Sequence, residues 1–156
     1  MAMYAALLRG ISPTNPNMSN ERLRKLFEKL GFGNVSTVIS SGNVLFDSNK
    51  KSKVLEAMIE KSIPKLGFKS TTIIKSKEQL KNLVNKNPFK GIQEAKNSRL
   101  NVTFLKNEPK TILKFPHKGD GYTLLGIYEN AICSSIDPSA TSPDLMLMLE
   151  SSSARR

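Results

Sequence analysis

The order of helix-like and strand-like segments in the first 75 residues restricts the fold of this chain more than any other feature. A helix is predicted between Ser19, which can cap its start, and Gly31, which can end it. Its apolar residues recur at helical spacing and form one stripe, made of Leu23, Leu26, Phe27 and Leu30. The helix therefore has one face that must be buried against another element.

A second helix is predicted from Ser52 to Ile63, because Pro64 would cost about 3 kcal/mol in a helix interior. Alternating or β-branched runs predict strands at residues 3–8, 35–40, 44–46 and 71–74. The turn of the hairpin is expected at Ser41-Gly42-Asn43, where Gly42 supplies a positive φ. The order β-α-β-β-α-β is typical of the ferredoxin-like arrangement, an antiparallel sheet with two helices on one face.

The second half of the chain shows the same order. The stretch Ser76 to Gln79 predicts a capping box and a helix that buries Leu80, Leu83 and Val84. Further elements are predicted as strands at 100–105, 122–128 and 131–136, with a turn at Glu129-Asn130, and as helices at 107–115 and 142–150. We therefore predict an α+β fold of two tandem ferredoxin-like (βαββαβ) units, the second lacking its last strand. The domains are residues 1–75, a helix and connecting loop at 76–99, and the incomplete unit at 100–156.

An incomplete second sheet would leave an open edge. Such an edge exposes unpaired backbone groups that can pair with another strand. We therefore expect that another segment completes the sheet or that the chain forms a homodimer through this edge.

Charge is concentrated in the middle of the chain. The net charge is +11, and residues 50–118 contain 17 Lys and Arg against 5 Asp and Glu, a net +12. Such a segment attracts polyanions, including nucleic acid, with an affinity that falls steeply with salt. A lysine-rich solvated surface explains the same composition, since base and phosphate-fork recognition favours Arg over Lys. Both interpretations stay open.

A small-anion site is the second candidate. Arg9 and Gly10 end the first strand and Asn15 lies in the following polar loop, near the start of the first helix. The turn at Ser41-Gly42-Asn43 offers further hydrogen-bonding groups. Turn chemistry alone accounts for Ser, Gly and Asn there, and Arg9 could pair with a local acid. The candidate ligand-binding residues are therefore Arg9, Gly10, Asn15, Ser41, Gly42 and Asn43.

Catalytic and metal-binding patterns are sparse. The chain has one histidine, His117, and one cysteine, Cys133, and nothing in the sequence brings them together as a nucleophile and base. A metal site needs three or four ligands, so we expect no metal and no cofactor. Cys133 alternates with apolar neighbours and is predicted to be a buried, inert thiol. No apolar run approaches the roughly 20 residues of a membrane span, so we expect no membrane partner and a cytoplasmic location.

Several short motifs resemble an uncharacterised bacterial family, domain of unknown function 1697. They occur in the family's order, at Tyr4–Ile11, Met18, Leu23, Leu30–Phe32, Val35, Ser41–Phe46, Asn87–Phe89 and Leu100–Leu105. The resemblance implies a bacterial cytosolic α+β protein and brings no established activity. Ser12–Asn15 replaces a loop that is often glycine-rich in the family, which argues against a phosphate cradle. The chain also has no tryptophan, whereas family members usually carry an Arg-Asn-Trp-like strand after the last helix.

These observations favour a non-enzymatic basic module that binds an anionic partner such as nucleic acid. The alternatives are an enzyme or sensor for a small phosphorylated or carboxylated metabolite, and a dimerising interaction protein.

Overall fold

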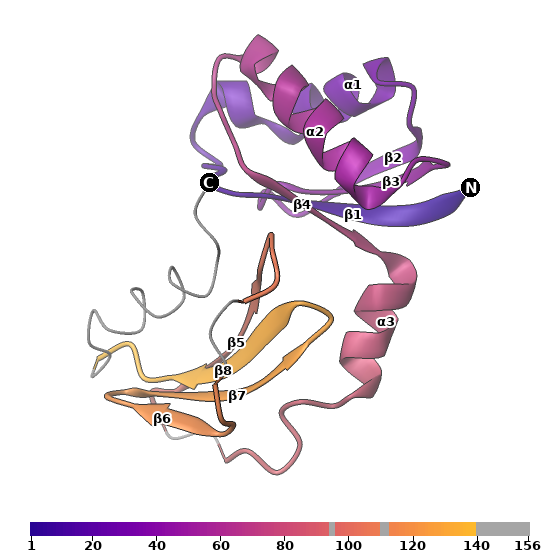
Figure 1. Ribbon diagram of the computed structural model, residues 1–156. Coiled ribbons are helices and arrows are strands. Elements are labelled where there is room, and N and C mark those ends of the chain that lie inside the picture. The colour runs from indigo at the N-terminus through magenta and orange to yellow at the C-terminus, as the bar shows by residue number, and fades with distance from the viewer. Residues whose placement is uncertain (94–95, 110–112, 140–156) are drawn as a thin grey trace. The chain divides into compact units, whose positions relative to one another are not determined.

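The protein has a mixed α+β fold with two four-stranded antiparallel sheets, as the computed structural model in Figure 1 shows. The structure describes residues 1–93, 96–109 and 113–139. The chain divides into two compact units, Met1–Leu80 and Lys81–Arg156.

The first unit contains four strands, two α-helices and two short 3-10 helices. They follow one another as β1 (Ala2–Leu8), η1 (Pro16–Met18), α1 (Asn20–Lys29), β2 (Gly33–Val38), β3 (Asn43–Ser48), α2 (Ser52–Ser62), η2 (Ile63–Leu66) and β4 (Thr72–Ser76). The strands are ordered β2-β3-β1-β4, and every neighbouring pair is antiparallel. The predicted order of the main elements in this segment is confirmed.

Helix α1 begins and ends where its sequence predicts. The Ser19 hydroxyl accepts a hydrogen bond from the Arg22 amide at 3.4 Å, and Gly31 has a φ of +83° just beyond the helix. The predicted stripe faces inward, with Leu23, Leu26 and Phe27 buried. On the solvent side, Lys25 lies 2.6 Å from Glu21 and lowers the pKa of that carboxyl group.

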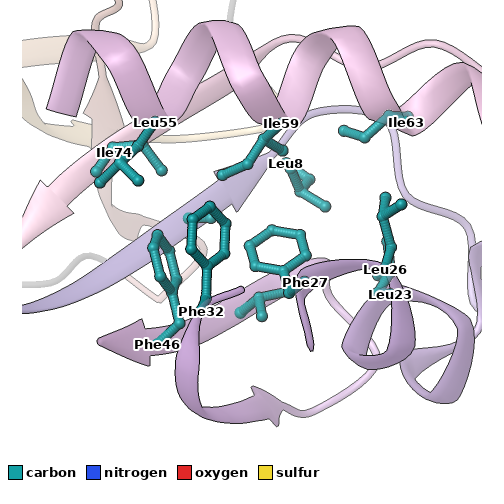
Figure 2. Close-up of a cluster of buried hydrophobic side chains, with 12 residues drawn as sticks. Leu8, Leu23, Leu26, Phe27, Phe32, Phe46, Leu55, Ile59, Ile63 and Ile74 are labelled. Carbon is teal, nitrogen blue, oxygen red and sulfur yellow. The ribbon is translucent and has the colours of Figure 1, made fainter. Parts of the chain in front are cut away.

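Both helices cover the same face of the first sheet, and the core lies between them and the sheet (Figures 1 and 2). Phe46 of β3 packs against Phe32 with ring centroids 4.6 Å apart and against Phe27 of α1 at 5.4 Å. Helix α2 contributes Leu55 and Ile59, which are fully buried. Burying each of these side chains stabilises the fold by about 1.5–3 kcal/mol.

The β2–β3 hairpin differs from the prediction. Its turn occupies residues 39–42, and Asn43 is already the first residue of β3, where it pairs with Val38 and Leu7. The predicted turn is wrong by two residues at its start and by one at its end, because the ladder closes at Val38–Asn43 and leaves a four-residue loop. Within that loop Ile39 has a φ of +45° and Gly42 a φ of +78°, so the expected positive φ of Gly42 is confirmed.

Helix α3 (Lys77–Asn85) starts with the predicted capping box. The Ser76 hydroxyl accepts from the Gln79 amide at 3.1 Å, and the Gln79 side chain accepts from the Ser76 amide at 2.9 Å. Leu83 is buried, as predicted. The prediction for Val84 is wrong, since this residue is 73% exposed.

The second unit holds β5 (Arg99–Phe104), β6 (His117–Gly119), β7 (Tyr122–Tyr128) and β8 (Ala131–Ile136). Its sheet order is β5-β8-β7-β6 with antiparallel neighbours. The prediction of three strands is wrong, because β6 adds a fourth beside β7. Only three residues form β6, which is too short for a periodic signal. The predicted turn is confirmed, as Glu129 and Asn130 have φ of +49° and +57°.

Two predicted helices fall largely outside the described residues. Residues 142–150 lie beyond the described chain, as does the tail. For the helix predicted at 107–115, residues 107–109 and 113–115 are not helical, and 110–112 are outside the described part.

Two small apolar clusters stabilise the second sheet. Leu105, Tyr122, Leu124 and Ile132 form one, and Leu83, Ala131 and Cys133 form the other. Cys133 is fully buried, and its burial raises the pKa of the thiol. In the described part of the chain, no helix has the length and apolar character needed to cross a membrane.

Candidate functional site

Three segments of the first unit meet where β1 ends. The Arg9 amide donates to the carbonyl of Thr71 at 3.0 Å, and the Ser70 hydroxyl donates to the carbonyl of Arg9 at 2.7 Å. On the other side of β1, the Leu8 amide donates to the carbonyl of Gly42 at 3.2 Å. The backbone thus brings Arg9 and the hairpin turn to the same end of the sheet.

Gly42 is required by the protein's own packing. A Cβ atom at this position would lie 2.3 Å from Cγ1 of Ile11 and 3.3 Å from Cβ of Leu8. The residue is also buried and has a φ of +78°. The close approach to its backbone is therefore made by Ile11. By contrast, Gly10 has a φ of +75° with nothing within 4 Å of its Cβ position.

Two of the predicted ligand-binding side chains are engaged in local turns. The Asn15 carbonyl oxygen Oδ1 accepts from the Asn17 amide at 3.0 Å, which caps the short helix η1. The Ser41 hydroxyl donates to the carbonyl of Val38 at 3.0 Å. Among the described residues, no acidic side chain forms an ion pair with Arg9. Arg9 is thus the predicted site residue with an exposed charge available to a ligand.

A second surface consists of the lysines around α2. Six lysines between residues 50 and 69 are all exposed, and we call them the α2 lysines: Lys50, Lys51, Lys53, Lys61, Lys65 and Lys69. In sequence this stretch contains two acids, Glu56 and Glu60. The direction of those two carboxylates therefore decides how much of the positive charge is neutralised.

Both acids bind the backbone of strand β4. Oε1 of Glu60 accepts from the Thr72 amide at 2.8 Å, and Oε1 of Glu56 accepts from the Ile74 amide at 3.2 Å. Glu56 is only 6% exposed. Its second oxygen lies 3.3 Å from Nζ of Lys53, whose side chain is 70% exposed. The carboxylates are thus directed toward the sheet while the α2 lysines point to solvent.

This role of Glu56 and Glu60 was not predicted from the sequence. Their spacing of four residues places both on one side of a helix, which is a readable signal. Identifying β4 as the strand that they bind requires the tertiary structure.

The N-terminus of α2 is strongly positive. Lys51 occupies the N-cap position, no side chain caps the helix, and no acid lies in its first turn. A Ser, Asp or Asn at the N-cap would stabilise the helix by about 0.5–2 kcal/mol more than a residue that cannot cap. Positive side chains here also oppose the helix dipole. The sequence therefore places lysines where stability alone would favour an acid or a cap.

Helix α1 shows the opposite arrangement. Lys25 pairs with Glu21 at 2.6 Å, and Arg24 lies 3.8 Å from Glu28. Two of the four cations of α1 are thus paired with acids of the same helix, which makes α1 a reference for the α2 lysines.

Three other kinds of site were considered in the sequence: an aromatic platform for bases, a cysteine–histidine pair and a metal centre. Phe46 is only 1% exposed in the core cluster under the helices, and the half-buried Tyr4 packs against it with ring centroids 5.9 Å apart, so the two rings do not form an exposed platform for bases. His117 pairs with Leu124 and Cys133 with Gly126, so strand β7 lies between them, and strands β6 and β8 are about 9.5 Å apart. No group of three potential metal ligands exists among the described residues.

The fold defines the class of this chain, a mixed α+β protein built on two antiparallel sheets. The chain belongs to the family described as protein of unknown function (DUF1697), whose model matches residues 1–120. The resemblance inferred from the sequence motifs is therefore confirmed.

A solved structure supports the fold. The conserved bacterial protein SP0830 from Streptococcus pneumoniae is similar with a TM-score of 0.63 and 18% sequence identity, over 94% of this chain and 80% of that chain. At this identity the similarity shows the fold alone. The comparison with curated proteins found no match.

Proposed function

We propose that this protein is a non-enzymatic module that binds an anionic polymer, such as single-stranded nucleic acid, through the α2 lysines. The observation that supports this proposal is the separation of charge across α2. Glu56 and Glu60 accept hydrogen bonds from β4, so they leave most of the lysine charge facing solvent. An exposed cluster of ammonium groups attracts phosphates and releases their counterions on binding.

The proposed binding relies on charge rather than on base recognition. In the first sheet Phe46 is buried and Tyr4 is half-buried, and the α2 surface offers lysines instead of the Arg forks that read base edges. We therefore expect little sequence preference. If all six α2 lysines contact phosphates, the slope of log affinity against log salt for a single strand is about −4. Affinity then falls about a thousandfold between about 0.05 M and about 0.3 M salt.

A matched pair of variants tests the proposal. The triple variant Lys61→Gln, Lys65→Gln, Lys69→Gln removes half of the α2 lysines, and the slope of binding to a single-stranded RNA should change from about −4 to about −2. The control removes the same formal charge from α1 through Arg24→Gln, Lys25→Gln and Lys29→Gln, and should change the slope by less than 1. Equal effects of the two variants, or no retention of the wild type on RNA or heparin at low salt, would overturn the proposal.

We also infer a tandem ferredoxin-like architecture. In the first unit, the order β2-β3-β1-β4 with antiparallel neighbours supports it. In the second unit, β5, β8 and β7 lie side by side in the same order as β1, β3 and β2 in the first unit. Strand β6 is an addition outside that pattern. An experimental structure that places a strand beside the outer edge of β5 would complete the second unit.

Recognition of a small carboxylated or phosphorylated molecule by Arg9 is the second candidate. It is supported by the anchoring of the Arg9 backbone on Thr71 and Ser70, together with a guanidinium group that no described acid neutralises. A thermal-shift screen of anionic metabolites tests it: a hit that disappears in Arg9→Ala supports this function, and a screen without hits contradicts it.

A further inference from the structure

The two sheets have four edge strands, namely β2 and β4 in the first sheet and β5 and β6 in the second. An edge strand presents unpaired N–H and C=O groups, and proteins usually protect such edges against pairing with another chain. Short strands, bulges, charged residues and covering side chains all serve this purpose. The four edges of this protein differ in this respect.

Three edges have recognisable protection. On β4, the outward amides of Thr72 and Ile74 are occupied by the carboxylates of Glu60 and Glu56. On β2, the register shifts between Gly33 and Ser36, and such a bulge twists an edge away from regular pairing. Strand β6 has only three residues and includes Lys118.

At Leu100 and Val102, strand β5 has no such protection from the described residues. Its six residues pair with β8 in unbroken register, and residues 100–104 contain neither a charge nor a proline. Leu105 donates to the carbonyl of Asn130 at 2.9 Å on the β8 side. Because backbone groups alternate along a strand, Leu100 and Val102 direct their N–H and C=O groups away from β8. No described residue occupies these groups, and Val102 is 37% exposed.

We propose that β5 pairs antiparallel with β5 of a second copy of this chain, across a two-fold axis at Asn101. In this register Leu100 lies opposite Val102 of the partner subunit, and Val102 opposite the partner's Leu100. These two pairs form four main-chain hydrogen bonds from the outward groups of each copy. The two-fold axis runs perpendicular to the sheet, so opposite residues share a face and both sheets keep the same side toward their own cores.

The charges along β5 favour this register. Arg99, the one charged residue of the strand, lies opposite Thr103 of the partner subunit, so the two guanidinium groups stay at opposite ends of the pair. The neutral Asn101 faces Asn101 of the partner subunit, and their amides can exchange a hydrogen bond. Two like charges directly opposite each other would destabilise such a pair.

The dependence of affinity on salt distinguishes this pairing from polyanion binding. Each copy has a formal net charge of +11, so the copies repel each other at low ionic strength and the dimer should become tighter as salt is added. Binding to a polyanion weakens over the same range. Failure of one proposal is therefore distinguishable from failure of the other.

The test is sedimentation velocity of the full chain over a concentration series at low and high salt. The wild type should shift from monomer to dimer, with more dimer at high salt. Val102→Pro removes one outward N–H and should remain monomeric, while Val102→Thr keeps that group and should still dimerise. Circular dichroism checks that each variant is folded, and an edge position tolerates proline best.

Charge substitutions at Asn101 give a second test that does not alter the backbone. Asn101→Lys and Asn101→Asp each place like charges on the two-fold axis and should be monomeric alone, because Asn101 is exposed and faces its own copy. A mixture of the two should form a heterodimer. A wild type that stays monomeric at every salt and concentration, or a mixture that associates no better than its components, would overturn the proposal.

Discussion

The substitution Gly42→Ala measures how strongly the hairpin turn depends on its glycine. An alanine would keep a φ of +78° and place its Cβ atom 2.3 Å from Cγ1 of Ile11. The left-handed conformation costs a residue with a side chain about 1–2 kcal/mol. Forcing an extra methyl group into packed surroundings costs about 1–3 kcal/mol. Lower entropy of the unfolded chain offsets about 0.4–1 kcal/mol. We therefore expect a loss of about 2–4 kcal/mol in the free energy of unfolding.

Gly10→Ala is the matched control. Gly10 has a φ of +75°, and nothing lies within 4 Å of its Cβ position. It therefore shares the backbone strain of Gly42 without the clash, and its net loss should be about 1 kcal/mol or less. Urea unfolding followed by far-UV circular dichroism compares the two variants, and the difference between them is the energy of the clash.

A double-mutant cycle assigns that clash to one contact. Ile11→Ala removes Cγ1, the nearest atom that a new Cβ at residue 42 would meet, and leaves the Ile11 Cβ at 2.9 Å, so the combined variant should lose less stability than the sum of the single variants. If Gly42→Ala costs no more than Gly10→Ala, or if Ile11→Ala brings no relief, then Gly42 is not fixed by packing.

Three further predictions concern local features. Ser76→Ala should lower the free energy of unfolding by about 1 kcal/mol. Adding Gln79→Ala should change little more, since one capping box holds both bonds; additive losses in urea unfolding would contradict this. Gly119→Ala should destabilise the second unit by about 1–3 kcal/mol, because its Cβ would overlap the ring of Tyr122; hydrogen exchange of β6 and β7 amides checks this, and unchanged exchange counts against it. Since burial raises the pKa of Cys133, the folded chain keeps this proton at pH values where the unfolded chain releases it. Stability should therefore fall above the ordinary thiol pKa in the wild type but not in Cys133→Ala, as measured by urea midpoints; parallel pH profiles would refute it.

Features fixed by neighbouring residues were predictable from the sequence. Helix α1, the capping box at Ser76 and the turn at Glu129-Asn130 depend on residues a few positions apart, and all three are confirmed. Features that depend on distant partners were not. Strand β6 exists because three residues pair with β7, and the hairpin turn moved because Val38 pairs with Asn43.

The candidate site shows the same division. The sequence suggested that Arg9 and the turn around Gly42 could serve one site, and the backbone brings them to the same end of the first sheet. The sequence did not show that the side chains of Asn15 and Ser41 form hydrogen bonds within local turns. Whether a polar side chain is available to a ligand depends on hydrogen-bond competition, which residue type alone does not reveal.

Helix α2 is formally neutral, since Ser52–Ser62 contains Lys53 and Lys61 against Glu56 and Glu60. Its acids nevertheless bind β4 while both lysines face outward, so the helix is polarised across its width as well as along its axis. The formal net charge of α2 therefore understates the electric field that an approaching anion meets.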